Sequence, residues 1–162
     1  MEQMAELAGF FAAHGVWCVS SGVVLTPILA FEMADGVRQM RRIVADELQD
    51  AVAQGQQWLA ENPDAAARAV LVFDGYLTLV SGKMDALLVE AVEYASERIG
   101  FTIAVPFRPA NSPHGFAVHR PKFLDYTGEE PDFEAVGSAF FRGVYSHEQA
   151  GEVWDKYLDE SQ

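Results

Sequence analysis

Four apolar stretches of similar length follow one another in the middle of the chain, and they constrain the fold more than any other feature. They cover residues 67–80, 84–94, 101–108 and 116–124, and short polar connections separate them. The third stretch alternates apolar with other side chains, the period of two that is typical of a strand with one buried face. Because parallel neighbours need long crossover connections, these short turns predict an antiparallel meander through residues 67–124.

The first of these stretches contains an Asp-Gly pair at residues 74–75, and two interpretations of it stay open. The pair could form a tight turn that divides the stretch, or a bulge in one long strand. We prefer the bulge, because the undivided strand matches its neighbours in length.

Helical and turn signals lie before the meander. Apolar spacings of three and four predict a helix over residues 2–14 that Gly15 ends, followed by buried strands at 16–19 and 23–33. The Asp35-Gly36 pair is typical of a hairpin turn, because it accepts positive φ angles. It should fold residues 37–44 back on the strand before it.

Capping patterns predict the other helices. Asp46 with Gln49 predicts the start of a central helix that Asn62-Pro63 ends. Asp132 should begin a helix that runs through Phe140 and Phe141. Ser146 with Gln149 predicts the start of a last helix.

Strands in runs with helices at the N-terminus, centre and C-terminus are typical of an α+β fold. We expect an antiparallel sheet of about six or seven strands packed against these helices. No repeat, low-complexity tract or flexible linker is visible, so residues 1–162 are expected to form a single compact domain.

Residues 7–31 carry no formal charge, and their length alone would make them a candidate membrane span. Ser20, Ser21, Gly22 and Pro27 interrupt the run with turn chemistry. Acidic residues stand where a signal peptide would have a basic region. We therefore expect this segment to be buried and the protein to be soluble and cytoplasmic, without a membrane partner.

Residues 98–124 contain no Asp or Glu, although the formal net charge of the chain is −13. The negative total excludes nucleic acid as an expected partner, because phosphate binding needs a net basic face. Within the acid-free segment the candidate residues for binding an anion or a partner are Arg108, His114, His119, Arg120 and Lys122. Arg108 and the 119–122 group should be neighbours across a hairpin. The preferred alternative is that the acidic tail, residues 125–160, folds over this segment and neutralises it.

No catalytic pattern is visible. The chain lacks a nucleophile elbow and a complete phosphate loop, and His114 and His119 have no third ligand at metal-site spacing. Cys18 is the only cysteine and is interpreted as a small buried hydrophobic residue. We expect no catalytic residue, metal or cofactor.

Three other groups of polar residues have simple structural interpretations. Arg38, Arg41 and Arg42 should lie on a solvated face and pair with acidic neighbours. His14 is expected to be partly buried and His147 to be solvated.

The charge surplus and the absence of a catalytic pattern favour a non-enzymatic acidic interaction protein that regulates or neutralises a basic protein partner. The alternative is a small-molecule enzyme or ligand binder that recognises an anionic group at residues 108–122. The sequence leaves a homodimer open.

Overall fold

The computed structural model describes all residues from 1 to 162 and consists of four helices and a seven-stranded sheet. This architecture confirms the α+β class expected from the sequence. In chain order the elements are α1 (Glu2–Ser20), β1 (Ile28–Glu32), β2 (Arg38–Arg42), α2 (Leu48–Glu61), β3 (Arg68–Leu79), β4 (Gly82–Tyr94), β5 (Arg98–Arg108), β6 (Ala117–Val118), β7 (Lys122–Thr127), α3 (Phe133–Ser146) and α4 (Glu148–Tyr157).

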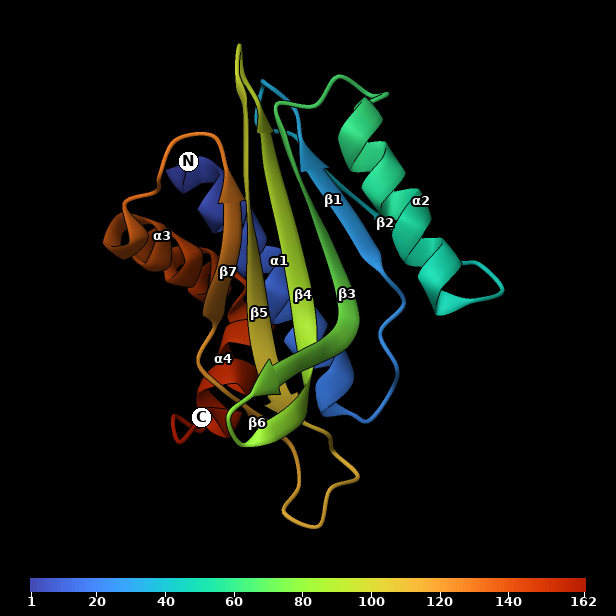
Figure 1. The fold of residues 1–162 in the computed structure, drawn as a ribbon, viewed down its shortest axis with the longest axis vertical. Helices are drawn as coiled ribbons and strands as arrows, with labels where there is room; N and C mark the ends of the chain where they lie inside the picture. The colour runs from blue at the N-terminus through green and yellow to red at the C-terminus, as the bar shows by residue number, and fades with distance from the viewer.

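The sheet is antiparallel throughout, in the order β2-β1-β3-β4-β5, and both β6 and β7 pair with the far edge of β5 (Figure 1). β3, β4 and β5 are sequential antiparallel neighbours, as the short turns predicted. The hairpin at Asp35-Gly36 is also confirmed, because β1 pairs with β2 from Ile28↔Arg42 to Glu32↔Arg38.

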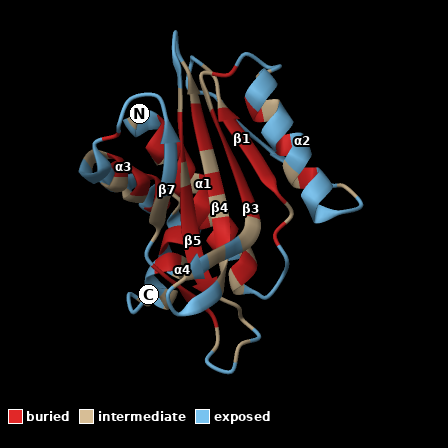
Figure 2. Cartoon of the chain, in the orientation of Figure 1, coloured by how far each residue is buried: buried red, intermediate tan, exposed pale blue.

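The two faces of the sheet are covered differently. α1 lies behind the sheet with α3 and α4 beside it, whereas α2 packs on the opposite face over β1 and β3 (Figure 1). β3 shows the division clearly, because Val70 and Val72 belong to the 29-residue core on the α1 side while Leu71 and Phe73 belong to the 8-residue core under α2. Buried residues therefore run along both faces of the central strands (Figure 2).

α1 and α3 approach each other at two glycines. A Cβ atom on Gly9 would lie 1.8 Å from the backbone oxygen of Phe140, and one on Gly143 would lie 2.0 Å from that of Glu6. Both distances are far below contact, so no side chain fits at either position. These glycines let the two helices pack backbone to backbone and fix the place of α3 beside the sheet.

The N-terminal prediction is wrong in two respects. α1 continues through Gly15 to Ser20, so residues 16–19 are helical and form no strand. Gly15 does not end the helix because it faces the sheet, where a Cβ atom would lie 3.0 Å from Leu87 Cδ1. The next strand is shorter than the expected 23–33, and Val23 and Val24 are exposed in the connection before β1.

β3 is undivided, as preferred, but it contains no bulge at Asp74-Gly75. Its register with β4 runs without a shift from Arg68↔Glu93 to Leu79↔Gly82. The irregularity of the sheet lies between β5 and β7, where the register shifts between Thr102 and Ile103.

The fourth predicted strand, 116–124, is wrong as a single element, because residues 119–121 separate β6 from β7. Two features of this interruption explain it. Pro121 has no N–H to contribute to a strand ladder. The buried His119 ring turns instead toward the C-terminal segment, where its Nδ1 lies 2.8 Å from the backbone oxygen of Asp159.

The helix caps were predicted with mixed success. Asn62 ends α2 in the left-handed conformation and Asp132 caps α3 by accepting from the Ala135 N–H at 3.1 Å, both as expected. Asp46 does not cap α2, whose N-cap is Glu47 without a side-chain bond. Ser146 does not cap α4 either, because its hydroxyl donates to the Gly143 carbonyl and His147 takes the N-cap position.

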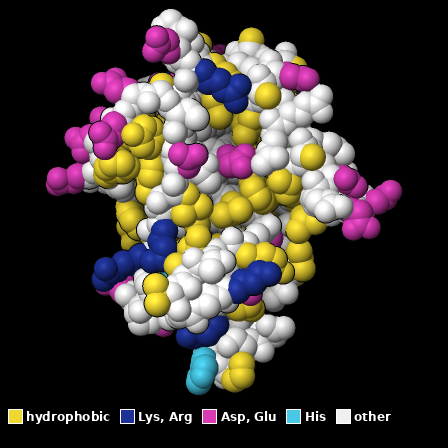
Figure 3. Space-filling model, in the orientation of Figure 1, with side chains coloured by type: hydrophobic (Ala, Val, Ile, Leu, Met, Phe, Trp, Pro, Cys, Tyr) yellow, Lys and Arg dark blue, Asp and Glu magenta, His cyan; other side chains and the backbone are white.

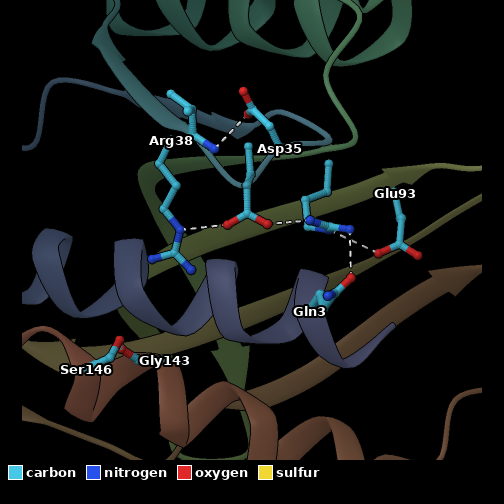
Figure 4. A network of polar contacts seen from close by, with 9 residues as sticks. Gln3, Asp35, Arg38, Glu93, Gly143 and Ser146 are labelled. Carbon is cyan, nitrogen blue, oxygen red and sulfur yellow. Dashed lines mark hydrogen bonds and ion pairs between the residues drawn. The ribbon is translucent and has the colours of Figure 1, made fainter.

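A polar network joins the N-terminal end of α1 to the sheet (Figure 4). Glu32 accepts from Arg38 Nε at 2.8 Å and also pairs with Arg68. The same Arg68 guanidinium donates to Glu93 at 3.2 Å and to Gln3 at 2.8 Å. Arg41 pairs with Asp64 at 3.3 Å, so two of the three arginines have the expected acidic neighbours.

The expectation of one solvated face for Arg38, Arg41 and Arg42 is only partly correct. Arg38 lies over the Phe10 ring on the α1 side and Arg41 over the Phe31 ring on the α2 side, so the two are on opposite faces of β2. Arg42 is exposed and forms no ion pair.

No helix of this structure combines the length and the apolar character needed to cross a bilayer.

Candidate partner-binding groove

The C-terminal segment contacts three of the residues that the sequence singled out. Arg120 pairs with Glu160 at 2.9 Å, and Arg108 Nη1 lies 3.7 Å from Asp159. His119 is 2% exposed and contacts the Asp159 backbone. These are the contacts expected if the acidic tail neutralises the acid-free segment.

The other two residues lie apart from this cluster. His114 is exposed in the loop after β5, and its carbonyl oxygen accepts from Arg108. Lys122 pairs in register with Ala104, and cross-strand partners share a face. The neighbours of Ala104 along β5, Ile103 and Val105, are in the core on the α1 side, so Lys122 points to the opposite face. The five residues therefore do not converge on one surface.

Beside Arg120 lies an apolar groove with a volume of about 520 Å³. It runs between β5 and β7 on one side and α3 with the segment after α4 on the other. We call it the α3 groove, and its principal lining residues are Ile103, Arg120, Phe123, Phe133, Phe140, Phe141, Tyr145, Leu158 and Glu160.

Local structure places the aromatic rings in the groove. Phe123 of β7 packs against Phe101 of β5 and lies edge-on to Phe133, with ring centroids 4.9 Å apart in the second pair. Phe133 is the first residue of α3 and is held there by the Asp132 cap. Further along α3, the residues that line the groove recur at spacings of three and four. They therefore lie on the same face of the helix as Phe133 and complete this wall of the groove.

The groove leaves large apolar side chains in contact with solvent. Phe133 is 48% exposed, Tyr145 50% and Leu158 37%. Burying such surface is favourable by about 25 cal/mol per Å² of apolar area. Contiguous exposed apolar surface with a polar rim is typical of a binding site.

Charged residues lie at the rim of the groove and beside it in the sequence. At one end the Arg120–Glu160 ion pair closes the rim. Within four positions of Phe133, the loop before α3 and its first turn contribute four exposed acids: Glu129, Glu130, Asp132 and Glu134. Asp132 caps α3, and none of the four forms an ion pair. On the left of Figure 3, acidic side chains border a hydrophobic patch at the edge of the molecule.

A histidine pair holds the start of α4, which leads to one wall of the groove. His14 Nδ1 lies 3.0 Å from His147 Nε2, and His147 Nδ1 accepts from the Ala150 N–H at 3.3 Å. Since Nδ1 of His147 is an acceptor, its Nε2 must carry the proton and donate to His14. The remaining proton of His14 is then on Nε2, a buried atom without a partner. His147 is therefore half-buried and structural, contrary to the expectation that it is solvated.

Burial is the main cause that lowers the pKa of both imidazoles. The neighbouring His147 and Arg42 lower the pKa of His14 further. Both rings are therefore held neutral, the state that the chain of hydrogen bonds requires.

Cys18 lies one turn beyond His14 on α1, and burial raises the pKa of its thiol. A raised pKa disfavours the reactive thiolate, in keeping with a structural role. Its thiol is half-buried, less enclosed than the sequence suggested.

Sequence reasoning missed the α3 groove. Its one local signal is the aromatic spacing in α3 directly after an acidic loop. The lining residues come from segments between positions 103 and 160, which only the fold brings together.

The chain matches no family model, no curated protein and no solved structure. What the groove can bind therefore follows from its own side chains.

Proposed function

We propose that this chain is a non-enzymatic, acidic interaction protein that acts in the cytoplasm and regulates or neutralises a protein partner bound in the α3 groove. The observation that carries the proposal is the half-exposed Phe133 at the end of an apolar groove lined by aromatic rings. Aromatic side chains in such settings are the usual anchors of protein interfaces.

The anionic-ligand alternative has less support. Arg108 and Arg120 already contact the carboxylates of Asp159 and Glu160, so an anion would have to displace the chain's own tail. Lys122 has no carboxylate within ion-pair distance, but it faces away from the groove. The basic stretch thus supports the conformation of the C-terminal segment better than it supports a separate anion site.

The test is a comparison of proteins captured by matched variants from the native cell. Phe133→Ser with Leu158→Ser removes two exposed apolar groups from the groove. Tyr76→Ser removes a 62% exposed aromatic side chain from β3, outside the groove, and serves as the control. We expect a protein retained by wild type and by the control to be lost from the groove variant.

An unchanged set of captured proteins, with the groove variant folded, would contradict the proposal. If the captured protein is the chain itself, size-exclusion chromatography should show a dimer that the groove variant loses. That result would make the partner a second copy and leave the groove as the interface.

A further inference from the structure

We infer that the occupant of the α3 groove is an amphipathic segment whose apolar side chains enter the groove and whose basic side chains meet the carboxylates next to Phe133. This inference rests on the proposed function, because it names the class of partner for the same groove.

The apolar part of the partner follows from the shape and lining of the groove. Phe133 is 48% exposed at one end, beside the half-buried Phe123, and Leu158 is 37% exposed at the other. A row of side chains on one face of a helix or strand fits such a groove, whereas a single small residue would leave much of its apolar surface exposed to solvent. An amphipathic helix that places its apolar face in a hydrophobic groove is one of the recurring modes of peptide recognition.

The charge of the partner follows from the acids next to Phe133. Glu129, Glu130 and Glu134 are exposed and form no ion pair, as is true of most acids of this chain. What distinguishes these three is their place within four residues of Phe133, an exposed aromatic ring that lines the groove. Glu134, in the first turn of α3, also interacts favourably with the positive end of the helix dipole. Glu129 and Glu130 precede the cap and add negative charge at the same end of α3.

The opposite end of the groove carries less unpaired negative charge. There Arg120 is paired with Glu160, and Asp155 accepts from the Tyr145 hydroxyl at 2.8 Å without forming an ion pair. Glu129, Glu130 and Glu134 outnumber this one carboxylate, so a partner with Lys or Arg at one end of its apolar row gains more with that end at Phe133.

The experiment uses the full chain and defined probes. A fluorescent synthetic amphipathic helix of about four turns carries a leucine face and lysines at one end, and a second probe carries glutamates in place of the lysines. Binding is followed by fluorescence anisotropy across salt concentrations. We expect the lysine probe to bind more tightly than the glutamate probe and Phe133→Ser with Leu158→Ser to abolish binding of both.

Amide variants test the carboxylates. Glu129→Gln, Glu130→Gln and Glu134→Gln together should weaken the lysine probe about tenfold at low salt, since each exposed charge pair contributes up to about 1 kcal/mol. This loss of affinity should disappear at about 1 M salt, where the screening length is about 3 Å. The control changes the net charge equally at exposed acids at the start of α2, on the opposite face of the sheet: Asp46→Asn, Glu47→Gln and Asp50→Asn. It should leave the affinity within about twofold.

Equal affinity for the two probes, or equal weakening by the two triple variants, would overturn the inference. If groove substitutions still remove the captured cellular partner in that case, the proposed function stands and only the class of partner is wrong. If groove substitutions change neither probe binding nor capture, both proposals fail.

Discussion

At the scale of single residues, His147 connects the end of α3 to the start of α4. Its Nδ1 satisfies the Ala150 N–H that would otherwise lack a helical partner. We expect His147→Ala to lower the free energy of unfolding by about 1 kcal/mol, the usual cost of losing an N-cap. His147→Asn supplies an acceptor at the same position and should retain most of that stability. Urea unfolding measures both, and equal stability of wild type and His147→Ala would contradict the capping role.

The same pair predicts how stability depends on pH. The folded-state pKa of each imidazole is lowered from the ordinary value of 6.5. The unfolded chain therefore binds more protons as pH falls below that value. The stabilisation from neutral histidines is complete above pH 6.5 and is lost as pH falls through the lower folded-state pKa values.

We expect the melting temperature to fall between pH 7 and 5, roughly, and to fall less in His147→Asn, which removes one titrating group. Thermal unfolding at a series of pH values measures this difference. Identical pH dependence in the two proteins would show that His147 does not carry the effect.

Residue-level prediction from the sequence worked where the partner is local. Asp132 caps α3 by accepting from a backbone N–H three residues away, so the local sequence predicts this cap. His14 and His147 are 133 positions apart, so no local pattern could connect them. The α4 cap was placed one residue too early, because Ser146 is a better cap by type, but its hydroxyl already bonds to the preceding turn.

At the scale of elements, the contact between α1 and α3 depends on glycine. A methyl group on Gly143 would collide with the Glu6 carbonyl oxygen, and backbone atoms cannot move aside as a side chain can. We expect Gly143→Ala to destabilise the protein by at least about 2 kcal/mol through overpacking.

Gly137 supplies the matched control on the same helix. A Cβ atom there meets nothing within 4 Å. Gly137→Ala should be neutral or should stabilise by up to about 1 kcal/mol, because alanine is the better helix former. Chemical denaturation compares the two variants, and a similar effect of both would contradict close packing of α1 on α3.

The C-terminal segment is held by weaker contacts. The Arg120–Glu160 pair is largely exposed, so Arg120→Ala with Lys122→Ala should cost no more than about 1 kcal/mol. Most of any loss should appear in Arg120→Ala alone, because Lys122 forms no ion pair. Unfolding in low and high salt would measure it, and a larger loss from Lys122→Ala would contradict this assignment.

Elements were predictable where periodicity and short turns agree, as in β3, β4 and β5. The prediction failed where tertiary contacts decide. Gly15 has the type of a helix end but packs against the sheet, and residues 119–121 break a strand to meet the C-terminal segment. Neither of these tertiary contacts can be predicted from the residues on either side of it in the sequence.

At the scale of the whole molecule, charge and apolar surface combine in the α3 groove. The sequence revealed the separation of charge, and the fold shows that part of the basic stretch pairs with the acidic tail. The groove itself was not predictable, because its walls come from the sheet, α3 and the C-terminal segment. Acidic residues near Phe133 in the sequence form no ion pair, and the proposed preference for basic partners rests on them.

The central claim is that a protein partner occupies the α3 groove, and cross-linking from within the groove tests it most directly. A photoreactive phenylalanine analogue placed at position 133 or 145 in the native cell should form a covalent adduct with one defined protein. The same analogue at position 76, an exposed aromatic site on β3, should not form that adduct. Adducts of equal yield from all three positions, or none from 133 and 145, would contradict the account.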